Sequence, residues 1–151
     1  MKILIDNKKA YYDFEVLDKY QAGIVLEGWE VKSLKFGRGS IGGSFIRIRS
    51  KESILSGASI SSWKNGILKS NEEEKRDRKL LLKSNEIKRI EAMTKEKGLT
   101  VVPLEVYMDD RGLIKVNLGV VRGKKKYDKR SKLKERDIKR GIEQDRKKYN
   151  I

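Results

Sequence analysis

The chain has 151 residues, and 37 Lys and Arg against 22 Asp and Glu give it a formal net charge of +15 at pH 7. It contains no Cys, which excludes disulfides, thiolate zinc sites and a cysteine nucleophile, and no His, which removes the usual general base and the commonest transition-metal ligand. No apolar run approaches the roughly 18 to 20 residues that a membrane helix needs, so we expect a soluble, cytoplasmic chain without a membrane partner.

The N-terminal quarter of the chain predicts two strands and a helix. Residues 11–17 alternate apolar with acidic side chains, the period of two that marks a strand with one wet face, and the apolar residues 24–26 predict a second strand. The spacing changes from Trp29 to Phe36, which favours a short helix that ends at Gly37.

The next predicted strand, residues 44–49, follows a turn-rich stretch. Its outward side chains, Phe45, Arg47 and Arg49, combine an aromatic ring with two cations, which suits base stacking and phosphate contact. A hairpin connection then leads to a further strand in residues 53–60.

A polar loop is expected over residues 61–77. Residues 79–82 fit either a buried strand or the first turn of a helix, because periodicity does not decide over so few residues. The following residues 83–86 are typical of a helix start, and a helix that Gly98 ends would then follow. Its apolar face would be formed by Ile87, Ile90, Ala92 and Met93.

The rest of the body predicts a hairpin. Residues 100–108 are rich in strand formers, although Pro103 argues for an edge or bulged position, and residues 109–112 make the turn. Residues 113–121 alternate as the returning strand. Six or seven short strands with two or three helices predict a mainly β fold with helical insertions, a small oligonucleotide-binding-like antiparallel β-barrel.

The end of the chain concentrates the charge. Residues 123–151 hold 13 Lys or Arg against 5 Asp or Glu, which is +8 and leaves +7 for residues 1–122. We expect one barrel domain in residues 1–122 and a basic tail in residues 123–151 that is disordered when free, because its few apolar residues cannot form a core. Favourable pairs four residues apart predict that it becomes helical on a partner. Such an arm favours a polyphosphate partner, RNA or DNA, over a merely solvating terminus.

The remaining motifs do not support a cofactor, a metal or catalysis. Residues 37–42 match G-x-G-x-x-G, but the dinucleotide fingerprint needs a strand before it and a helix after it, and the order here is reversed. Residues 119–124 have one residue too few for a phosphate loop. The acidic residues 72–74 and 109–110 are better explained as a loop charge run and turn chemistry than as Mg²⁺ ligands. We expect no cofactor, no metal, no catalytic residue and no enzymatic activity.

Five segments form a far more specific combination. They are residues 7–10 (NKKA), 22–34 (AGIVLEGWEVKSL), 78–82 (RKLLL), 100–104 (TVVPL) and 123–130 (GKKKYDKR). In these segments the chain resembles the small protein B (SmpB) family, whose members bind transfer-messenger RNA in bacterial trans-translation. The segments span nearly the whole chain.

The resemblance implies a barrel that grips the tRNA-like domain of transfer-messenger RNA and a basic tail that enters the empty mRNA channel of a stalled ribosome. The RNA surface implied for the barrel comprises Asn7, Lys8, Gln21, Glu30, Lys32, Ser33 and Leu81. The residues implied near the decoding centre, in small-subunit rRNA, are Lys124, Lys125, Tyr127, Asp128, Lys129 and Arg130. The implied function is delivery of transfer-messenger RNA for ribosome rescue and tagging of nascent chains, by a monomer.

Two positions depart from the family pattern. Gln21 stands where the family usually has Glu, so an acceptor is kept and a charge is lost. Residues 71–77 (NEEEKRD) replace a loop that usually carries Asn-His and a proline, so contacts from that loop do not transfer. Glu30 has three interpretations: it accepts from a base amino group or a 2′-hydroxyl, it orients Lys32, or it is a helix-start acid.

Two other classes of function stay open at this point. A ribosomal or initiation-factor-like barrel would dock permanently on rRNA and would co-purify with ribosomes when transfer-messenger RNA is absent. A metal-dependent nuclease would cleave RNA with Mg²⁺ and would lose that activity in Glu30→Gln.

Overall fold

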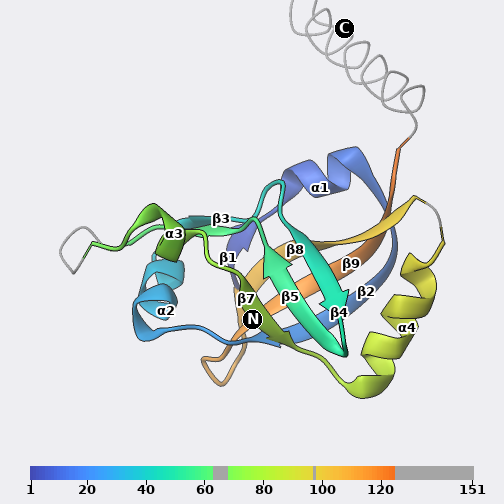
Figure 1. Ribbon diagram of the computed structural model, residues 1–151. Helices are drawn as coiled ribbons and strands as arrows, with labels where there is room; N and C mark the ends of the chain where they lie inside the picture. Colours follow the sequence, from blue (N-terminus) through green and yellow to red (C-terminus); the bar gives the residue numbers. More distant parts are fainter. Residues whose placement is uncertain (63–67, 97, 125–151) are drawn as a thin grey trace, which may run out of the picture.

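The computed structural model describes residues 1–62, 68–96 and 98–124 (Figure 1). Its helices are α1 (Lys8–Asp13), α2 (Gly28–Lys35), α3 (Asn71–Glu74) and α4 (Ser84–Thr94). Its strands are β1 (Lys2–Asp6), β2 (Phe14–Ile24), β3 (Gly39–Ser40), β4 (Phe45–Arg49), β5 (Glu52–Ser56), β6 (Ser59–Ile60), β7 (Arg78–Leu81), β8 (Leu99–Met108) and β9 (Ile114–Gly123). The predicted tail lies outside the described residues from residue 125 on, so its disorder and its bound helix stay predictions.

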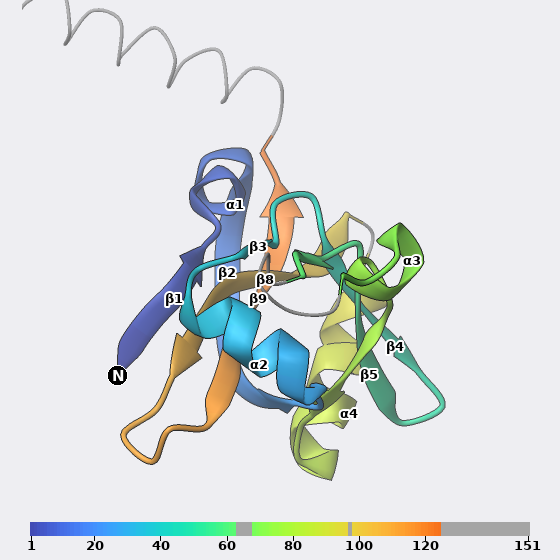
Figure 2. The same cartoon turned by 90° about the vertical axis from the view of Figure 1, so that its left-hand side faces the viewer.

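Seven strands form one antiparallel sheet in the order β1-β8-β9-β2-β7-β5-β4, and β3 pairs with β6 in a separate short ladder. The sheet coils until β4, its last strand, lies near β8 (Figures 1 and 2). In the described part of the chain no ladder joins these two strands, and a groove of ≈ 370 Å³ at the seam is walled by β4, β8 and the end of α4. The predicted fold class is confirmed, as a barrel whose last seam carries no backbone ladder.

β2 is one long strand where the sequence predicts two. Its ladder with β9 runs from Phe14 to Gly23, with one bulge after Val16. The predicted start at residue 11 is wrong, because residues 8–13 form α1.

Asn7 explains why α1 forms there. Its side-chain oxygen accepts a hydrogen bond from the backbone N–H of Ala10 at 3.3 Å, as a helix N-cap does, and its amide nitrogen donates to the carbonyl of Pro103 at 2.8 Å. A helix of six residues is too short to show its own period, so the alternation through Tyr12 resembles a strand in the sequence.

Pro103 lies at a bulge. β8 runs between β1 and β9, so the edge position allowed by the sequence is wrong, while the register with β9 shifts between Pro103 and Glu105. The bulge accommodates a residue that has no N–H to give to the ladder.

α4 follows most of its prediction. Ile87 and Ile90 are buried, and Met93 packs against the core. Ala92 is exposed, and its predicted place on the apolar face is wrong because it lies about 200° around the helix from Ile90. The helix ends at Thr94, whose hydroxyl donates to the carbonyl of Ile90 at 2.9 Å.

Two other predicted segments are divided in the structure. The strand expected over residues 53–60 becomes β5 and β6, because Gly57 adopts a φ of +82° between them. The polar loop expected over residues 61–77 contains α3, which begins after Ser70, whose hydroxyl accepts from the N–H of Glu73 at 3.2 Å.

The core lies on both faces of the β8–β9 hairpin. The main cluster fills the barrel and includes Leu34 of α2 and Ile90 of α4. A smaller cluster of Ala10, Val102, Leu104 and Val121 lies under α1. The helices therefore occupy separate places around the sheet, with α1 well away from α2 and α4 (Figures 1 and 2). Among the described helices, none has the length and apolar character needed to cross a membrane.

The Tyr20–Asp18 pair predicts an alkaline effect on stability. Burial raises the pKa of Tyr20 to about 12, helped by the bond of 2.6 Å that its hydroxyl donates to the Asp18 carboxylate. The usual tyrosine pKa is 10.0, so the unfolded chain loses this proton first as pH rises. The contribution of the Tyr20–Asp18 pair to the free energy of unfolding is therefore full below pH 10 and is lost as the pH approaches 12. The stability advantage over Tyr20→Phe in urea unfolding should therefore shrink across this window. A constant difference would contradict the prediction.

Candidate RNA interface

Gln21 and Leu81 come together on the surface where β2 pairs with β7. Gly23 of β2 lies opposite Leu81. A cavity of ≈ 520 Å³ at this place has Gln21, Gly23, Leu81, Lys83 and Lys115 among its lining residues. A neighbouring cavity of ≈ 340 Å³ shares Leu81 and extends to Val31 of α2 and to Leu113. We name the two cavities together the Leu81 groove.

The Leu81 groove combines exposed apolar side chains with cations. Leu81 is 54% exposed and Leu113 is 56% exposed, and Lys83 and Lys115 border them. Lysines supply phosphate contacts, while an exposed leucine offers an apolar surface to a ribose or an unstacked base. Lys32 is exposed and follows directly after a residue of the groove wall on α2. This arrangement suits a folded RNA.

Asn7, Lys8 and Lys124 lie around α1, at the other end of β2. Asn7 is buried and caps the helix, whereas Lys8 is exposed. The backbone N–H of Lys124 donates to the carbonyl of Asp13 at 3.1 Å, and its Nζ donates to the carbonyl of Tyr11 at 3.2 Å. These residues therefore lie apart from the Leu81 groove. The two bonds of Lys124 hold the end of β9 against α1.

The other residues implied near the decoding centre are Lys125, Tyr127, Asp128, Lys129 and Arg130. They lie outside the described residues, so their role stays a prediction. β9 runs to Gly123, and the N–H of Lys124 is bonded to α1, while the predicted division of the chain after residue 122 stays a prediction.

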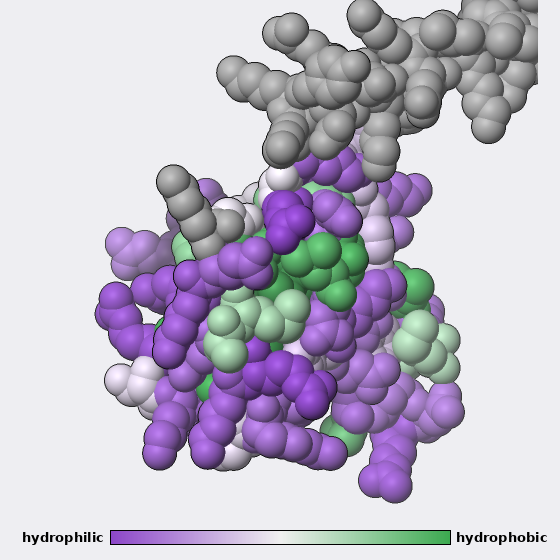
Figure 3. Space-filling model, turned by 90° about the vertical axis from the view of Figure 1, so that its right-hand side faces the viewer, coloured by the Kyte–Doolittle hydropathy of each residue, from purple (hydrophilic) through white to green (hydrophobic). Residues whose placement is uncertain are grey.

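The outward face of β4 is only partly available to RNA. Phe45 and Arg49 are exposed, but Arg47 donates to the hydroxyl of Ser56 at 2.9 Å and pairs with Asp77 at 2.6 Å. Figure 3 shows the side of the molecule opposite α2, where hydrophilic side chains cover most of the described surface around a hydrophobic patch. Base stacking by Phe45 stays a prediction.

Glu30 and Ser33 are fully buried, so neither side chain offers a surface to RNA. The hydroxyl of Ser33 has no hydrogen-bond partner in the part of the chain that the structure describes. Oε1 of Glu30 accepts from the backbone N–H of Glu27 at 2.8 Å, so Glu30 does act as a helix-start acid. Any effect of Glu30 on RNA binding has to pass through its neighbours.

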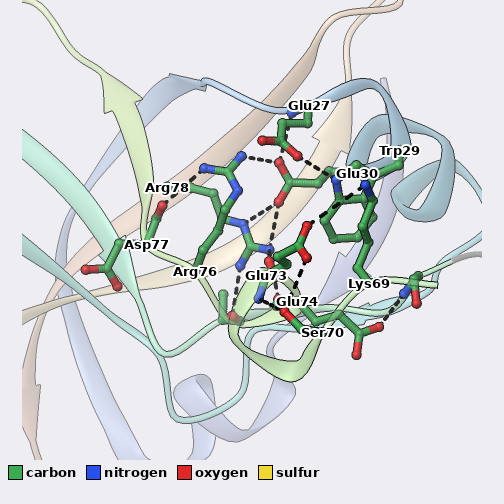
Figure 4. A network of polar contacts seen from close by, with 12 residues as sticks. Glu27, Trp29, Glu30, Lys69, Ser70, Glu73, Glu74, Arg76, Asp77 and Arg78 are labelled. Atoms are coloured by element: carbon green, nitrogen blue, oxygen red, sulfur yellow. Dashed lines mark hydrogen bonds and ion pairs between the residues drawn. The ribbon is translucent and has the colours of Figure 1, made fainter. Parts of the chain in front are cut away.

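Those neighbours form a buried ion-pair network with Glu30 at its centre (Figure 4). Arg78 is fully buried, and its Nε and a terminal nitrogen lie 2.8 and 2.7 Å from Oε2 of Glu30. Arg76 reaches the same carboxylate at Oε1. Burial lowers the pKa of Arg78, and the Glu30 carboxylate opposes this shift by stabilising the charged guanidinium.

Arg78 also ties the loop before β7 to the barrel. It donates to the carbonyl of Ala58 at 2.9 Å and to the carbonyl of Glu74 at 2.8 Å. The carboxylate of Glu74 in turn accepts from the N–H of Ser62, which lowers the pKa of Glu74. One buried guanidinium thus links α2, α3 and the segment before β6 to the strand that carries Leu81.

The acidic residues weighed as Mg²⁺ ligands have other partners. Asp109 accepts from the N–H groups of Arg111 and Leu113, each at 2.9 Å, and these bonds lower its pKa. This is the turn chemistry that the sequence predicts. In the described ranges no three acidic side chains gather as they would around a metal ion.

Several residues of the interface escape the sequence patterns. Lys83, Leu113 and Lys115 belong to the Leu81 groove because the sheet order brings β9 and β7 to the two sides of β2. Arg78 could be singled out from the sequence, since it is the first residue of the RKLLL segment, but no sequence motif indicates Arg76. No spacing in the sequence joins Arg76 to Glu30.

Comparison with known proteins identifies relatives that all belong to one family. The family model described as SmpB protein matches residues 4–148. The chain is 45% identical over 142 residues to the SsrA-binding protein of Thermosipho africanus, covering 94% of this chain and 95% of the relative. It is 46% identical over 142 residues to the SsrA-binding protein of Carboxydothermus hydrogenoformans, covering 94% of each.

A solved structure is also similar. It is described as "tmRNA-SmpB: a journey to the center of the bacterial ribosome", and its SmpB-like chain is 42% identical with a TM-score of 0.69. The match covers 83% of this chain and 87% of that chain. The two chains are therefore similar in sequence as well as in fold.

The buried network predicts a large difference between two arginines. Arg78→Met leaves the Glu30 carboxylate buried with one of its two partners gone, so the free energy of unfolding should fall by about 3–5 kcal/mol. Arg47→Met removes the exposed Arg47–Asp77 pair and should cost less than about 1 kcal/mol. Urea unfolding of both variants measures the contrast. Equal losses would show that the network does not hold the fold.

Proposed function

The chain belongs to the SmpB family, and we propose that it binds transfer-messenger RNA and delivers it to stalled ribosomes for trans-translation. The observation that carries this proposal is the match, over most of both chains, to an SmpB structure described together with transfer-messenger RNA and the bacterial ribosome. The Leu81 groove adds local support, because it joins Gln21 and Leu81, two residues that the family resemblance assigns to the RNA surface.

We assign the two regions of the structure to two RNA environments. The Leu81 groove, with Lys32 beside it, faces the tRNA-like domain of transfer-messenger RNA, where its lysines contact phosphates. Lys124 lies at the far end of β2 and belongs to the side that faces the small ribosomal subunit, whereas the neighbouring Lys8 stays a predicted contact of transfer-messenger RNA. We propose that the basic residues after Lys124 bind at the decoding centre and in the mRNA channel.

The proposed role requires no catalysis by the protein. It acts by holding one RNA in position against another, through charge and shape. It works where ribosomes translate, in the cytoplasm.

Salt dependence tests the RNA-binding part. If about six phosphates are contacted at roughly 0.7 counterions each, the plot of log affinity against log salt should have a slope near −4. Filter binding or fluorescence titration of the full chain with transfer-messenger RNA, from low to physiological salt, measures it. An unrelated RNA of equal length is the control. A flat response, or equal affinity for both RNAs, would sink the proposal.

Truncation tests the division of labour. A chain ending at Lys124 keeps the β9 ladder and the contacts of Lys124 with α1, so it should fold and retain most of its affinity for transfer-messenger RNA. It should lose rescue activity, because residues 125–151 are absent. Circular dichroism, RNA titration and a tagging assay on stalled ribosomes report the three quantities. Full rescue by the truncated chain would refute the role given to the tail.

A further inference from the structure

The network around Glu30 contains one positive charge more than it contains negative charge. Two guanidinium groups converge on a single, fully buried carboxylate (Figure 4). The two oxygens of Glu30 accept from Arg78, from Arg76 and from the backbone N–H of Glu27. One arginine is neutralised by this carboxylate, and the other remains in excess.

Arg78 is the neutralised partner. Its side chain is 0% exposed and makes two contacts with Oε2 of Glu30. Its terminal nitrogens also donate to the carbonyls of Ala58 and Glu74. Every nitrogen of this side chain thus has an acceptor, and none is exposed to an incoming anion.

Arg76 is the excess cation. Its side chain is 31% exposed. Apart from Glu30 it has one long hydrogen bond, of 3.3 Å, from a terminal nitrogen to the carbonyl of Asp77. Its Nε has no acceptor among the described residues, but it is buried and therefore closed to a ligand from outside. A guanidinium carries five N–H donors, so each of the two terminal nitrogens keeps one N–H without an acceptor in the described part of the chain.

Three of the four carboxylates of this loop, residues 71–77, are engaged elsewhere. Asp77 pairs with Arg47 at 2.6 Å, Glu74 accepts from the N–H of Ser62, and Glu73 lies 3.9 Å from Lys69. Within the described ranges, Glu30 is the one carboxylate within 4.0 Å of a nitrogen of Arg76. The protein therefore leaves the exposed edge of Arg76 without a second counter-charge.

We propose that this edge of Arg76 binds a backbone phosphate of the RNA, with Glu30 as the positioning residue that aims the guanidinium. The inference rests on the proposed RNA-binding function and adds a contact to it. A planar guanidinium can keep one N–H on the carboxylate and present others to phosphate oxygens, and a charge-assisted pair of this kind is stronger than a neutral hydrogen bond. The phosphate supplies the negative charge that the network lacks. Arg76 lies in the loop where the chain departs from the family pattern.

Arg76→Gln in the full chain tests the phosphate contact. Affinity for transfer-messenger RNA should fall about 5- to 10-fold, and the slope of log affinity against log salt should become less steep by about 0.7. Arg76→Lys keeps the charge but not the planar fork, so its affinity should be intermediate. The thermal midpoint, measured by circular dichroism, should show that Arg76→Gln stays folded, because Glu30 keeps Arg78 and the N–H of Glu27.

Lys75→Gln is the matched control. It removes the same charge one residue away, from an exposed side chain. Equal affinity losses in Lys75→Gln and Arg76→Gln would mean that only net charge matters, and would overturn the inference. So would an unchanged slope in Arg76→Gln. If the unmodified chain shows no preference for transfer-messenger RNA, the proposed function fails first, and the two failures are thereby distinguished.

A double-mutant cycle tests the positioning role of Glu30. If Glu30 acts through Arg76, Glu30→Gln should weaken RNA binding in the unmodified chain but have little further effect in Arg76→Gln. The cycle is measured at a temperature at which circular dichroism shows every variant folded. Additive losses would mean that Glu30 affects RNA binding by another route, and the positioning role would be lost.

Discussion

The buried contact between Glu30 and Arg78 is the interaction on which the arrangement of this protein depends. Two opposite charges without exposed surface are tolerable only when their lone pairs and donors are met, and here the donors of Arg78 reach the Glu30 carboxylate and the carbonyls of Ala58 and Glu74. These partners belong to α2, to α3 and to the segment before β6. The contact therefore decides how α2 lies against β7, and with it the position of Val31 relative to Leu81 across the groove.

The barrel uses β2 to keep two basic regions apart. One end of this strand meets α1 and Lys124, and the other end meets β7 and forms the Leu81 groove. A single long ladder with β9 makes the strand a rigid spacer between them. A protein that has to hold one RNA and reach into a second gains from such a spacer, because the two contacts cannot compete for the same surface.

Patterns along the sequence predict those parts of the fold that depend on neighbours in the chain. The period of two over residues 44–49, the helix that Gly37 ends and the apolar face of α4 apart from Ala92 follow from local spacing, and Gly37 indeed has a φ of +69°. The helix α1 could not be predicted, because its six residues are too few to show a helical period and the bond that ties its N-cap, Asn7, to Pro103 is distant in sequence. The residues of the candidate site also divide into those that the sequence indicates and those that only the structure reveals. The RKLLL segment indicates Leu81, whereas Leu113 and the pairing of Arg76 with Glu30 come only from tertiary structure.

The place where the chain leaves the barrel has a mechanical consequence. β9 is hydrogen-bonded on both sides, to β2 and to β8, and Lys124 follows it directly while bonded to the last turn of α1. Ladder bonds lie across the strand direction, so a pull along β9 loads many of them at once instead of peeling them one by one. A pull on the chain at Lys124 would thus be shared by many ladder bonds of β9, and little of it would reach the Leu81 groove at the other end of the hairpin.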